Sequence, residues 1–157
     1  MPNEFNADDI FEMAVKIEQN GAAFYRKAAE NVDGDSNKQF LLDLAKMEDE
    51  HELTFAAMKK ELAADETFST TFDPEDENAA YLMAFADSRV FFKKDQPQSS
   101  LEDILGCAIQ TEKDSIAFYL GMKELVPEKL GKGKLDDIIK EEMGHIRILA
   151  GKLAEYS

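Results

Sequence analysis

Three side chains able to bind a metal ion in the first half of this sequence recur in the second half at one constant offset. A lone glutamate and a Glu-x-x-His pair in the first half are each matched by the same residue type 94 residues later. Carboxylate oxygens and imidazole nitrogens are ligands that iron, manganese and zinc take in proteins. The candidate metal ligands are Glu18, Glu48, His51, Glu112, Glu142 and His145.

The charges of these six side chains match those of two divalent metal ions. The residues of each Glu-x-x-His pair are three apart, so both side chains leave the same face of one helix. Four carboxylates buried together would repel one another, and burying one without compensation costs several kcal/mol. Two divalent cations balance four carboxylates, and two neutral imidazoles complete the coordination. We therefore predict a site for two metal ions, with iron or manganese favoured and zinc also compatible.

Three further residues are candidate catalytic residues beside the ligands. Tyr25 and Tyr119 each follow the lone glutamate of their half by seven residues, which is two turns along nearly the same helix face. One interpretation is that each tyrosine lies near the metals, as a hydrogen-bond donor or a redox-active phenol. The other is that each is a core aromatic residue with a satisfied hydroxyl group. Glu141 either accepts a proton from a ligand histidine across the bundle or is a surface residue. Met47 holds the matching position in the first half, so these surroundings are not symmetric.

The apolar residues of the first half predict a helical hairpin over residues 6–62. A helix from Asn6, a favourable N-cap, to about Asn31 has apolar residues at steps of three and four. A second helix is predicted to begin with Ser36 and Gln39, which are spaced as a capping box. The Glu-x-x-His pair stands at core positions of that helix, in a face formed by Leu41, Leu44, Phe55, Met58 and Leu62.

A long connection follows the first hairpin. Residues 63–99 are less regular, and Asp73-Pro74 within them is typical of a helix start, with aspartate as the cap and proline in the first turn. We predict a short helix from there to about Phe91. A link of this length makes sense if it is a crossover that travels the length of a bundle.

The second half predicts another helical hairpin, over residues 100–156. Its first helix begins with Ser100 as the N-cap, and its second helix carries Glu142 and His145 in an otherwise apolar face. Two helical hairpins joined by one long crossover are the layout of ferritin-like four-helix bundles. We therefore predict an all-α bundle, with residues 1–157 as a single domain.

The composition limits the class of protein further. The formal net charge of −15 argues against a nucleic-acid partner, because phosphate binding needs lysine and arginine. Cys107 is the one cysteine, so neither an internal disulfide nor a cysteine-held metal centre is expected. The N-terminal residues do not resemble a signal peptide, and no apolar run approaches the length of a membrane span. We expect a cytoplasmic protein with no membrane partner.

Taken together, these motifs resemble the rubrerythrin-like branch of the ferritin-like di-iron proteins. The resemblance rests on the two lone glutamates with a tyrosine seven residues later, on the two Glu-x-x-His pairs, and on their order and spacing. Residues 17–25 and 111–119 look like the signature segments of that family. The resemblance covers nearly all of the chain except the crossover.

This resemblance implies a carboxylate-bridged site for two iron ions, with Glu48 and Glu142 as bridges and Glu18 and Glu112 as terminal ligands. Typical rubrerythrins add a rubredoxin-like domain with four cysteines, which this sequence does not show. Electrons are therefore expected from a separate donor, such as a rubredoxin-type protein. Typical rubrerythrins also have a further glutamate ligand at the position that Ser115 occupies here. The resemblance also suggests a homodimer.

Three functions remain open on this sequence. The resemblance implies an oxidoreductase that reduces hydrogen peroxide in oxidative-stress defence. The six-residue ligand set is also that of bacterioferritin-type ferroxidase centres and is close to that of dimanganese catalases. A ferroxidase that uses oxygen and serves iron storage or handling is therefore the alternative, and the acidic composition agrees with it. The third possibility is a helical module that a metal stabilises and that is not an enzyme.

Overall fold

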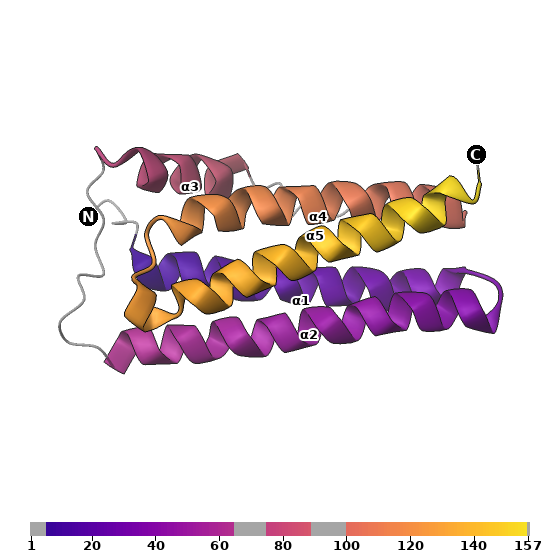
Figure 1. The fold of residues 1–157 in the computed structure, drawn as a ribbon, viewed down its shortest axis with the longest axis horizontal. Helices are drawn as coiled ribbons and strands as arrows, with labels where there is room; N and C mark the ends of the chain where they lie inside the picture. Colours follow the sequence, from indigo (N-terminus) through magenta and orange to yellow (C-terminus); the bar gives the residue numbers. More distant parts are fainter. Residues whose placement is uncertain (1–5, 65–74, 89–99, 157) are drawn as a thin grey trace.

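Four long amphipathic helices lie side by side in the computed structural model, and a shorter helix lies against one end (Figure 1). The structure describes residues 6–64, 75–88 and 100–156. These residues contain no β-strand, which confirms the all-α prediction. The helices are α1 (Ala7–Asn31), α2 (Asp35–Ala64), α3 (Glu77–Ser88), α4 (Leu101–Lys123), the 3-10 helix η1 (Glu128–Leu130) and α5 (Lys132–Ala154).

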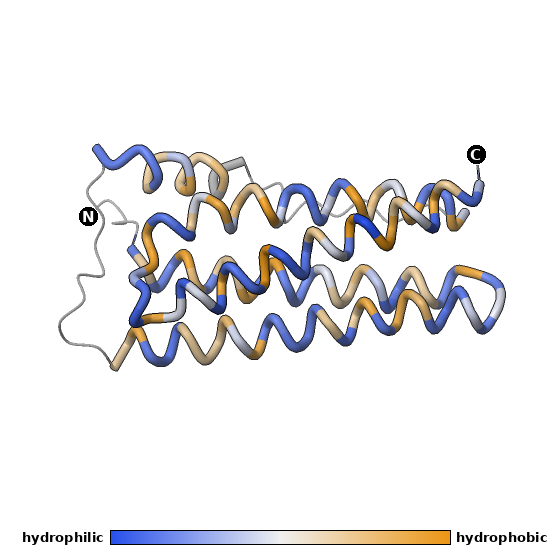
Figure 2. Tube along the Cα trace, in the orientation of Figure 1, coloured by the Kyte–Doolittle hydropathy of each residue, from blue (hydrophilic) through white to orange (hydrophobic). Residues whose placement is uncertain are grey.

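The long helices form two antiparallel pairs, α1 with α2 and α4 with α5 (Figure 1). A short turn joins the helices of the first pair, and a turn that contains η1 joins those of the second. Each of these helices shows hydrophobic and hydrophilic residues in alternation, as one apolar stripe requires (Figure 2). Within the three described ranges, we find no helix that has both the length and the apolar character needed to cross a membrane.

Side-chain caps fix the first turns of α1 and α4. The Asn6 side chain accepts a hydrogen bond from the Asp9 amide at 3.0 Å, and the Asp9 carboxylate accepts one from the Asn6 amide at 3.1 Å. This reciprocal pair satisfies amides that have no partner inside the helix. In the second half, the Ser100 hydroxyl accepts from the Asp103 amide at 3.1 Å. Both N-caps were predicted from the sequence, and both are confirmed.

The predicted start of α2 is wrong. The helix begins at Asp35, so Ser36 lies inside its first turn and does not form a capping box with Gln39. Gly34 precedes the helix with a φ of 91°, a left-handed conformation that glycine adopts without steric cost. Its carbonyl oxygen accepts the Lys38 amide at 3.1 Å, so the glycine turn itself starts the helix.

The predicted start of α3 is also wrong. The helix begins at Glu77 and ends at Ser88, and Asp76 caps its first turn. The Asp76 carboxylate accepts two backbone amides of the first turn, at 2.9 and 3.1 Å. The Asp73-Pro74 pair and Phe91, which bound this helix in the prediction from the sequence, lie outside the described residues.

A glycine in α4 lets α3 approach closely. The Tyr81 ring of α3 lies over Gly121, where an added Cβ would stand 2.7 Å from two ring carbons. The Tyr81 hydroxyl donates to the carbonyl oxygen of Ala117 at 2.8 Å, and the neighbouring Leu82 is fully buried. These contacts hold α3 against the outside of the second hairpin.

The apolar core is divided into two clusters along the bundle. One cluster includes Ile10, Phe11, Phe55, Met58 and Leu135. The other includes Phe24, Leu41, Leu44, Ile104 and Leu149. Full burial of one such side chain contributes about 1.5–3 kcal/mol. Between the clusters, at mid-length, each long helix places polar side chains in the interior. The core therefore surrounds a polar centre from both ends.

Candidate metal centre

The six candidate ligands meet in the polar centre of the bundle. Glu18 comes from α1, Glu48 and His51 from α2, Glu112 from α4, and Glu142 and His145 from α5. Each of the six is at most 4% exposed to solvent. Charged side chains are almost never buried to this degree unless they are paired or bind a metal. All four long helices are needed to bring the set together.

The six residues form two overlapping groups, each suited to one metal ion. The first group is Glu18, Glu48, His51 and Glu142, and the second is Glu48, Glu112, Glu142 and His145. Within each group, one ligand atom from every residue lies within 4.8 Å of all the others. Glu48 and Glu142 belong to both groups. Each group therefore contains one imidazole and three carboxylates, two of which are shared.

The inward-facing imidazole nitrogens lie close to the carboxylates of both hairpins. His51 Nδ1 is 2.7 Å from Glu142 Oε1 and 3.6 Å from Glu18 Oε2. His145 Nδ1 is 3.4 Å from Glu112 Oε1 and 3.6 Å from Glu48 Oε1. The two rings are stacked, with centroids 5.9 Å apart and planes 19° from parallel. The imidazoles thus lie side by side on one flank of the carboxylates.

Five buried ligand atoms have no hydrogen-bond partner among the described residues. These atoms are Glu18 Oε2, His51 Nδ1, Glu112 Oε2, Glu142 Oε1 and His145 Nδ1. His51 Nδ1 and Glu142 Oε1 remain unsatisfied although they are 2.7 Å apart, so their approach lacks the geometry of a hydrogen bond. Buried polar atoms of native proteins are normally satisfied. Oxygen and nitrogen atoms that converge without hydrogen bonds among them fit the coordination of metal ions.

The two buried tyrosines connect the hairpins at this site. Tyr25 donates its hydroxyl to Glu112 at 2.7 Å, and Tyr119 donates to Glu18 at 2.7 Å. Each phenol therefore supports the lone glutamate of the other half. The hydrogen bonds place both tyrosines beside the candidate ligands, and both rings also pack in the apolar clusters. Each tyrosine is therefore a core aromatic residue whose hydroxyl group is hydrogen-bonded to a candidate ligand.

The outward-facing imidazole nitrogens have different neighbours. His51 Nε2 lies 2.5 Å from a Glu141 carboxylate oxygen, and His145 Nε2 lies 3.0 Å from the Met47 sulfur. Glu141 of α5 thus contacts His51 of α2, a candidate ligand from the other hairpin. Sequence reasoning did not identify Met47 as a neighbour of His145. The signal was present, since Met47 precedes Glu48 as Glu141 precedes Glu142.

A solved protein structure has a similar arrangement of helices. It is a protein from Thermotoga maritima, provisionally described as a ferritin-like diiron-carboxylate protein, with a TM-score of 0.71 and 24% sequence identity over the whole of both chains. The chain has a ferritin-like fold. No protein-family model matches the sequence, and no curated protein matches it. The fold prediction is confirmed, and the functional argument depends on the site.

Burial makes this centre retain protons when no cation is bound. Burial, together with the neighbouring Glu18, raises the pKa of Glu48 to about 8. Burial and the charge of Glu48 also raise the pKa of Glu142. Burial alone would lower the pKa of His51, but the Glu142 and Glu18 carboxylates outweigh it and raise that pKa to about 11. Protons are therefore one way to balance the buried charge, and metal ions are the other.

The phenols next to the carboxylates hold their protons firmly. Burial, reinforced by Glu48, raises the pKa of Tyr25 well above its ordinary value. Burial, reinforced by Glu18, does the same for Tyr119. Both tyrosines are therefore hydrogen-bond donors over the whole physiological range of pH.

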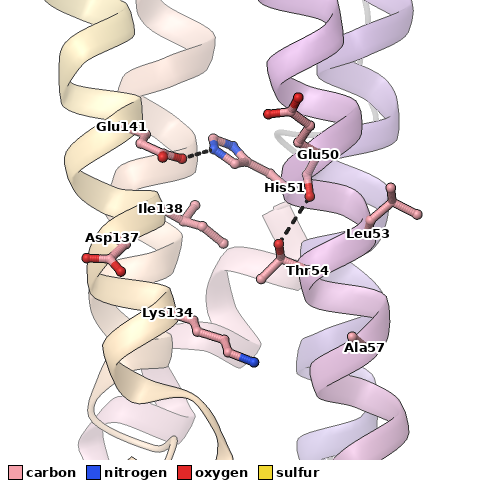
Figure 3. A pocket seen from close by; sticks show the side chains of 9 residues that line it. All are labelled: Glu50, His51, Leu53, Thr54, Ala57, Lys134, Asp137, Ile138 and Glu141. Carbon is pink, nitrogen blue, oxygen red and sulfur yellow. Dashed lines mark hydrogen bonds and ion pairs between the residues drawn. The ribbon is translucent and has the colours of Figure 1, made fainter.

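A groove between α2 and α5 reaches the histidines from the surface. It has a volume of about 470 Å³, and its lining includes His51, Thr54, Lys134, Ile138 and Glu141. Figure 3 shows the Glu141 side chain of α5 reaching across to His51 of α2 at one end of this groove. A smaller hollow of about 260 Å³ continues along the same face past Met47 and His145. The sequence did not predict this groove, because it depends on how far apart the hairpins pack.

The position of a possible seventh ligand differs between the halves. The Glu48 carboxyl group approaches Gly21 closely, since a Cβ added to the glycine would lie 3.4 Å from the carboxyl carbon. Ser115 is the matching residue 94 positions later, and its hydroxyl donates to the Thr111 carbonyl oxygen at 3.0 Å. The centre therefore contains four carboxylates from these helices and no fifth at either position.

Proposed function

We propose that this ferritin-like bundle holds two metal ions, for which Glu18 and Glu112 would each serve one ion and Glu48 and Glu142 would be available to both. The observation that carries the proposal is the pair of overlapping ligand groups that share Glu48 and Glu142. Iron suits this mixture of carboxylates and imidazoles, and manganese or zinc are the alternatives. The description of the similarly folded protein from Thermotoga maritima supports iron as the first metal to test.

We further propose that the centre reduces hydrogen peroxide. One peroxide molecule takes two electrons and two protons and yields two water molecules. When bound, two ferrous ions would supply the two electrons and the Lewis acidity for this reaction. A separate donor protein, of the rubredoxin type, would then restore the electrons. The resemblance of the motifs to rubrerythrins favours peroxide as the substrate.

The residues around the ligands have roles that follow from their contacts. Tyr25 and Tyr119 orient Glu112 and Glu18 through hydrogen bonds and keep protons within reach of the centre. Glu141 accepts the Nε2 proton of His51, which leaves Nδ1 free to face the carboxylates. The surrounding apolar clusters pack against the centre from both ends of the bundle, and the groove between α2 and α5 leads to it from the surface.

The test compares two oxidants on the same protein. Protein loaded anaerobically with Fe²⁺ would be mixed in a stopped-flow instrument with hydrogen peroxide and, separately, with oxygen. The proposal predicts that peroxide oxidises the iron faster than oxygen at equal concentration. Oxidation by peroxide that is no faster than by oxygen would contradict the peroxidase function. The variant Glu48→Ala is the control for iron outside the centre.

A ferroxidase that serves iron handling is the second candidate, and the acidic groove favours it. Three carboxylates (Glu50, Asp137 and Glu141) and one lysine (Lys134) line the groove that leads from the surface to His51, and the net charge of the chain is −15. An acidic path of this kind raises the local concentration of cations. This function requires iron to leave the centre after oxidation. Uptake of many more than two irons per chain under oxygen would support it, and retention of two would count against it.

A further inference from the structure

We propose that the two metal positions are unequal, and that the ion beside His51 binds first and more tightly than the ion beside His145. This inference rests on the two-metal site proposed above. It concerns the residues that contact the outer nitrogen of each imidazole, Glu141 in one case and Met47 in the other. We assign Glu141 as a positioning residue for His51.

The two positions offer the same types of ligand. Each position has one imidazole, one glutamate of its own and the shared pair Glu48 and Glu142. Each imidazole turns Nδ1 toward the carboxylates and Nε2 toward the face between α2 and α5. Each lone glutamate accepts one tyrosine hydroxyl at 2.7 Å. The types of ligand therefore do not distinguish the two positions, whereas the residues behind the two imidazoles do.

Glu141 strengthens His51 as a ligand in two ways. Its carboxylate lies 2.5 Å from His51 Nε2, so it accepts the proton of that nitrogen and fixes Nδ1 as the nitrogen that binds metal. A carboxylate in this position also makes the imidazole more basic and therefore a better ligand. In addition, Glu141 places a negative charge beside the first position, which attracts a cation.

Met47 gives His145 neither advantage. Its sulfur lies 3.0 Å from His145 Nε2, and a thioether is only a weak acceptor for an N–H donor. Methionine is also uncharged, so it adds nothing to the attraction of a second cation. Met47 and Glu141 stand directly before Glu48 and Glu142, at equivalent positions of the two halves. Exchanging the side chains at positions 47 and 141 should therefore reverse the order in which the two metal positions fill.

The expected difference in metal affinity between the two positions can be estimated from the effect of such hydrogen-bonded partners in other metal sites. Loss of a hydrogen-bonded partner behind a ligand histidine typically lowers metal affinity 10–100-fold. The Glu141 side chain is 61% exposed, so water weakens its effect. We therefore expect the first position to bind about 10-fold more tightly than the second, at the low end of that range.

Two histidines in the chain make the order of binding directly visible. The metal-free protein would carry isotopically labelled histidine, and the nitrogen resonances would be followed by NMR during titration with Zn²⁺. The variant His145→Gln assigns the two rings. We expect the first equivalent of Zn²⁺ to shift the Nδ1 resonance of His51, and the second to shift that of His145.

Exchange of the outer residues tests the cause. Glu141→Met should make the two imidazoles respond together, and the double variant Met47→Glu with Glu141→Met should reverse the order. Glu141→Gln keeps an acceptor for the Nε2 proton without the charge and should retain a smaller preference. Glu30→Gln, which removes an exposed carboxylate on α1, should keep the native order.

The outcomes separate this inference from the proposed function. Two imidazoles that respond together in the native protein would overturn the inference and leave the metal site intact. An order that the double variant does not change would overturn the role of Glu141. If neither imidazole responds to Zn²⁺, the metal site itself is refuted. A native order that starts at His51 and reverses in the double variant supports the inference.

Discussion

Tyr25 in α1 donates its hydroxyl to Glu112 in α4 at 2.7 Å, so a residue of the first hairpin supports a candidate ligand of the second. Tyr119 and Glu18 repeat the relationship in the opposite direction. The two hairpins therefore share one centre, and neither could form it alone. This exchange also explains why the sequence repeat preserves the tyrosines together with the glutamates.

Replacing Tyr25 with phenylalanine tests this connection. The variant keeps the aromatic ring in the core but removes the hydrogen bond to Glu112, which is buried. A buried acceptor left without its donor costs about 1–3 kcal/mol, so we expect the free energy of unfolding of the metal-free protein to fall by that amount. A bound cation would satisfy the same carboxylate, so the loss should be smaller in metal-loaded protein. Urea denaturation of both forms measures the two values.

The control for this variant is Tyr156→Phe. Tyr156 is 47% exposed, and removing its hydroxyl should change the free energy of unfolding by no more than about 0.5 kcal/mol. Equal effects of the two substitutions would contradict the role that we assign to the Tyr25 hydroxyl.

The metal-free protein should lose stability as the pH rises. Glu48 has a pKa of about 8 in the folded chain against an ordinary value of 4.5, and His51 has about 11 against 6.5. Between the ordinary and folded values of each group, the folded state holds a proton that the unfolded state releases. Raising the pH therefore favours unfolding from about pH 4.5 upward, first through Glu48 and then through His51.

Metal should reverse this dependence on pH. The ligands bind metal in their deprotonated forms, so the affinity for a cation rises with pH while the metal-free fold weakens. We expect the metal-induced increase in melting temperature to be larger at pH 8 than at pH 6. Thermal melts of both forms across this range provide the measurement. An increase that shrinks as the pH rises would show that these groups are not the ligands.

Gly121→Ala should loosen α3 from the bundle. An added Cβ would stand 2.7 Å from the Tyr81 ring, and overpacking of this kind costs about 1–3 kcal/mol. Gly106→Ala is the matched substitution in the same helix, with nothing within 4 Å of its added Cβ. There we expect a gain of up to about 1 kcal/mol from helix propensity. Chemical denaturation of both variants should separate them, and equal stabilities would contradict the packing of Tyr81.

The helical fold was predictable from the sequence because apolar periodicity reports directly on burial. Every residue expected on the inner face of α2 is buried, from Leu41 to Leu62, with Glu48 and His51 among them. The caps Asn6 and Ser100 were predictable for a different reason. Each forms its hydrogen bonds within one turn of the chain, so residue type and spacing are enough to identify it. Features that depend only on residues close in the sequence can therefore be predicted from it.

Features that depend on packing between hairpins were not predictable. Nothing in the spacing of Tyr25 shows that it reaches Glu112, because that contact is fixed by how the second hairpin lies against the first. The contact of Met47 with His145 and the groove beside Glu141 have the same origin. The start of α2 was wrong for a different reason. There the glycine turn before Asp35 prevailed over a capping pattern at the next residue.

The most direct test of the central claim is the metal content of the protein loaded with Fe²⁺ and freed of excess metal by gel filtration. The overlapping ligand groups that share Glu48 and Glu142 predict two ions per chain. Glu48→Ala removes a ligand common to both groups and should lose most of that metal, while its helical circular dichroism remains. Two ions in the native protein and few in Glu48→Ala would support the centre. Native protein that retains no metal, or a variant that retains as much as the native protein, would contradict it.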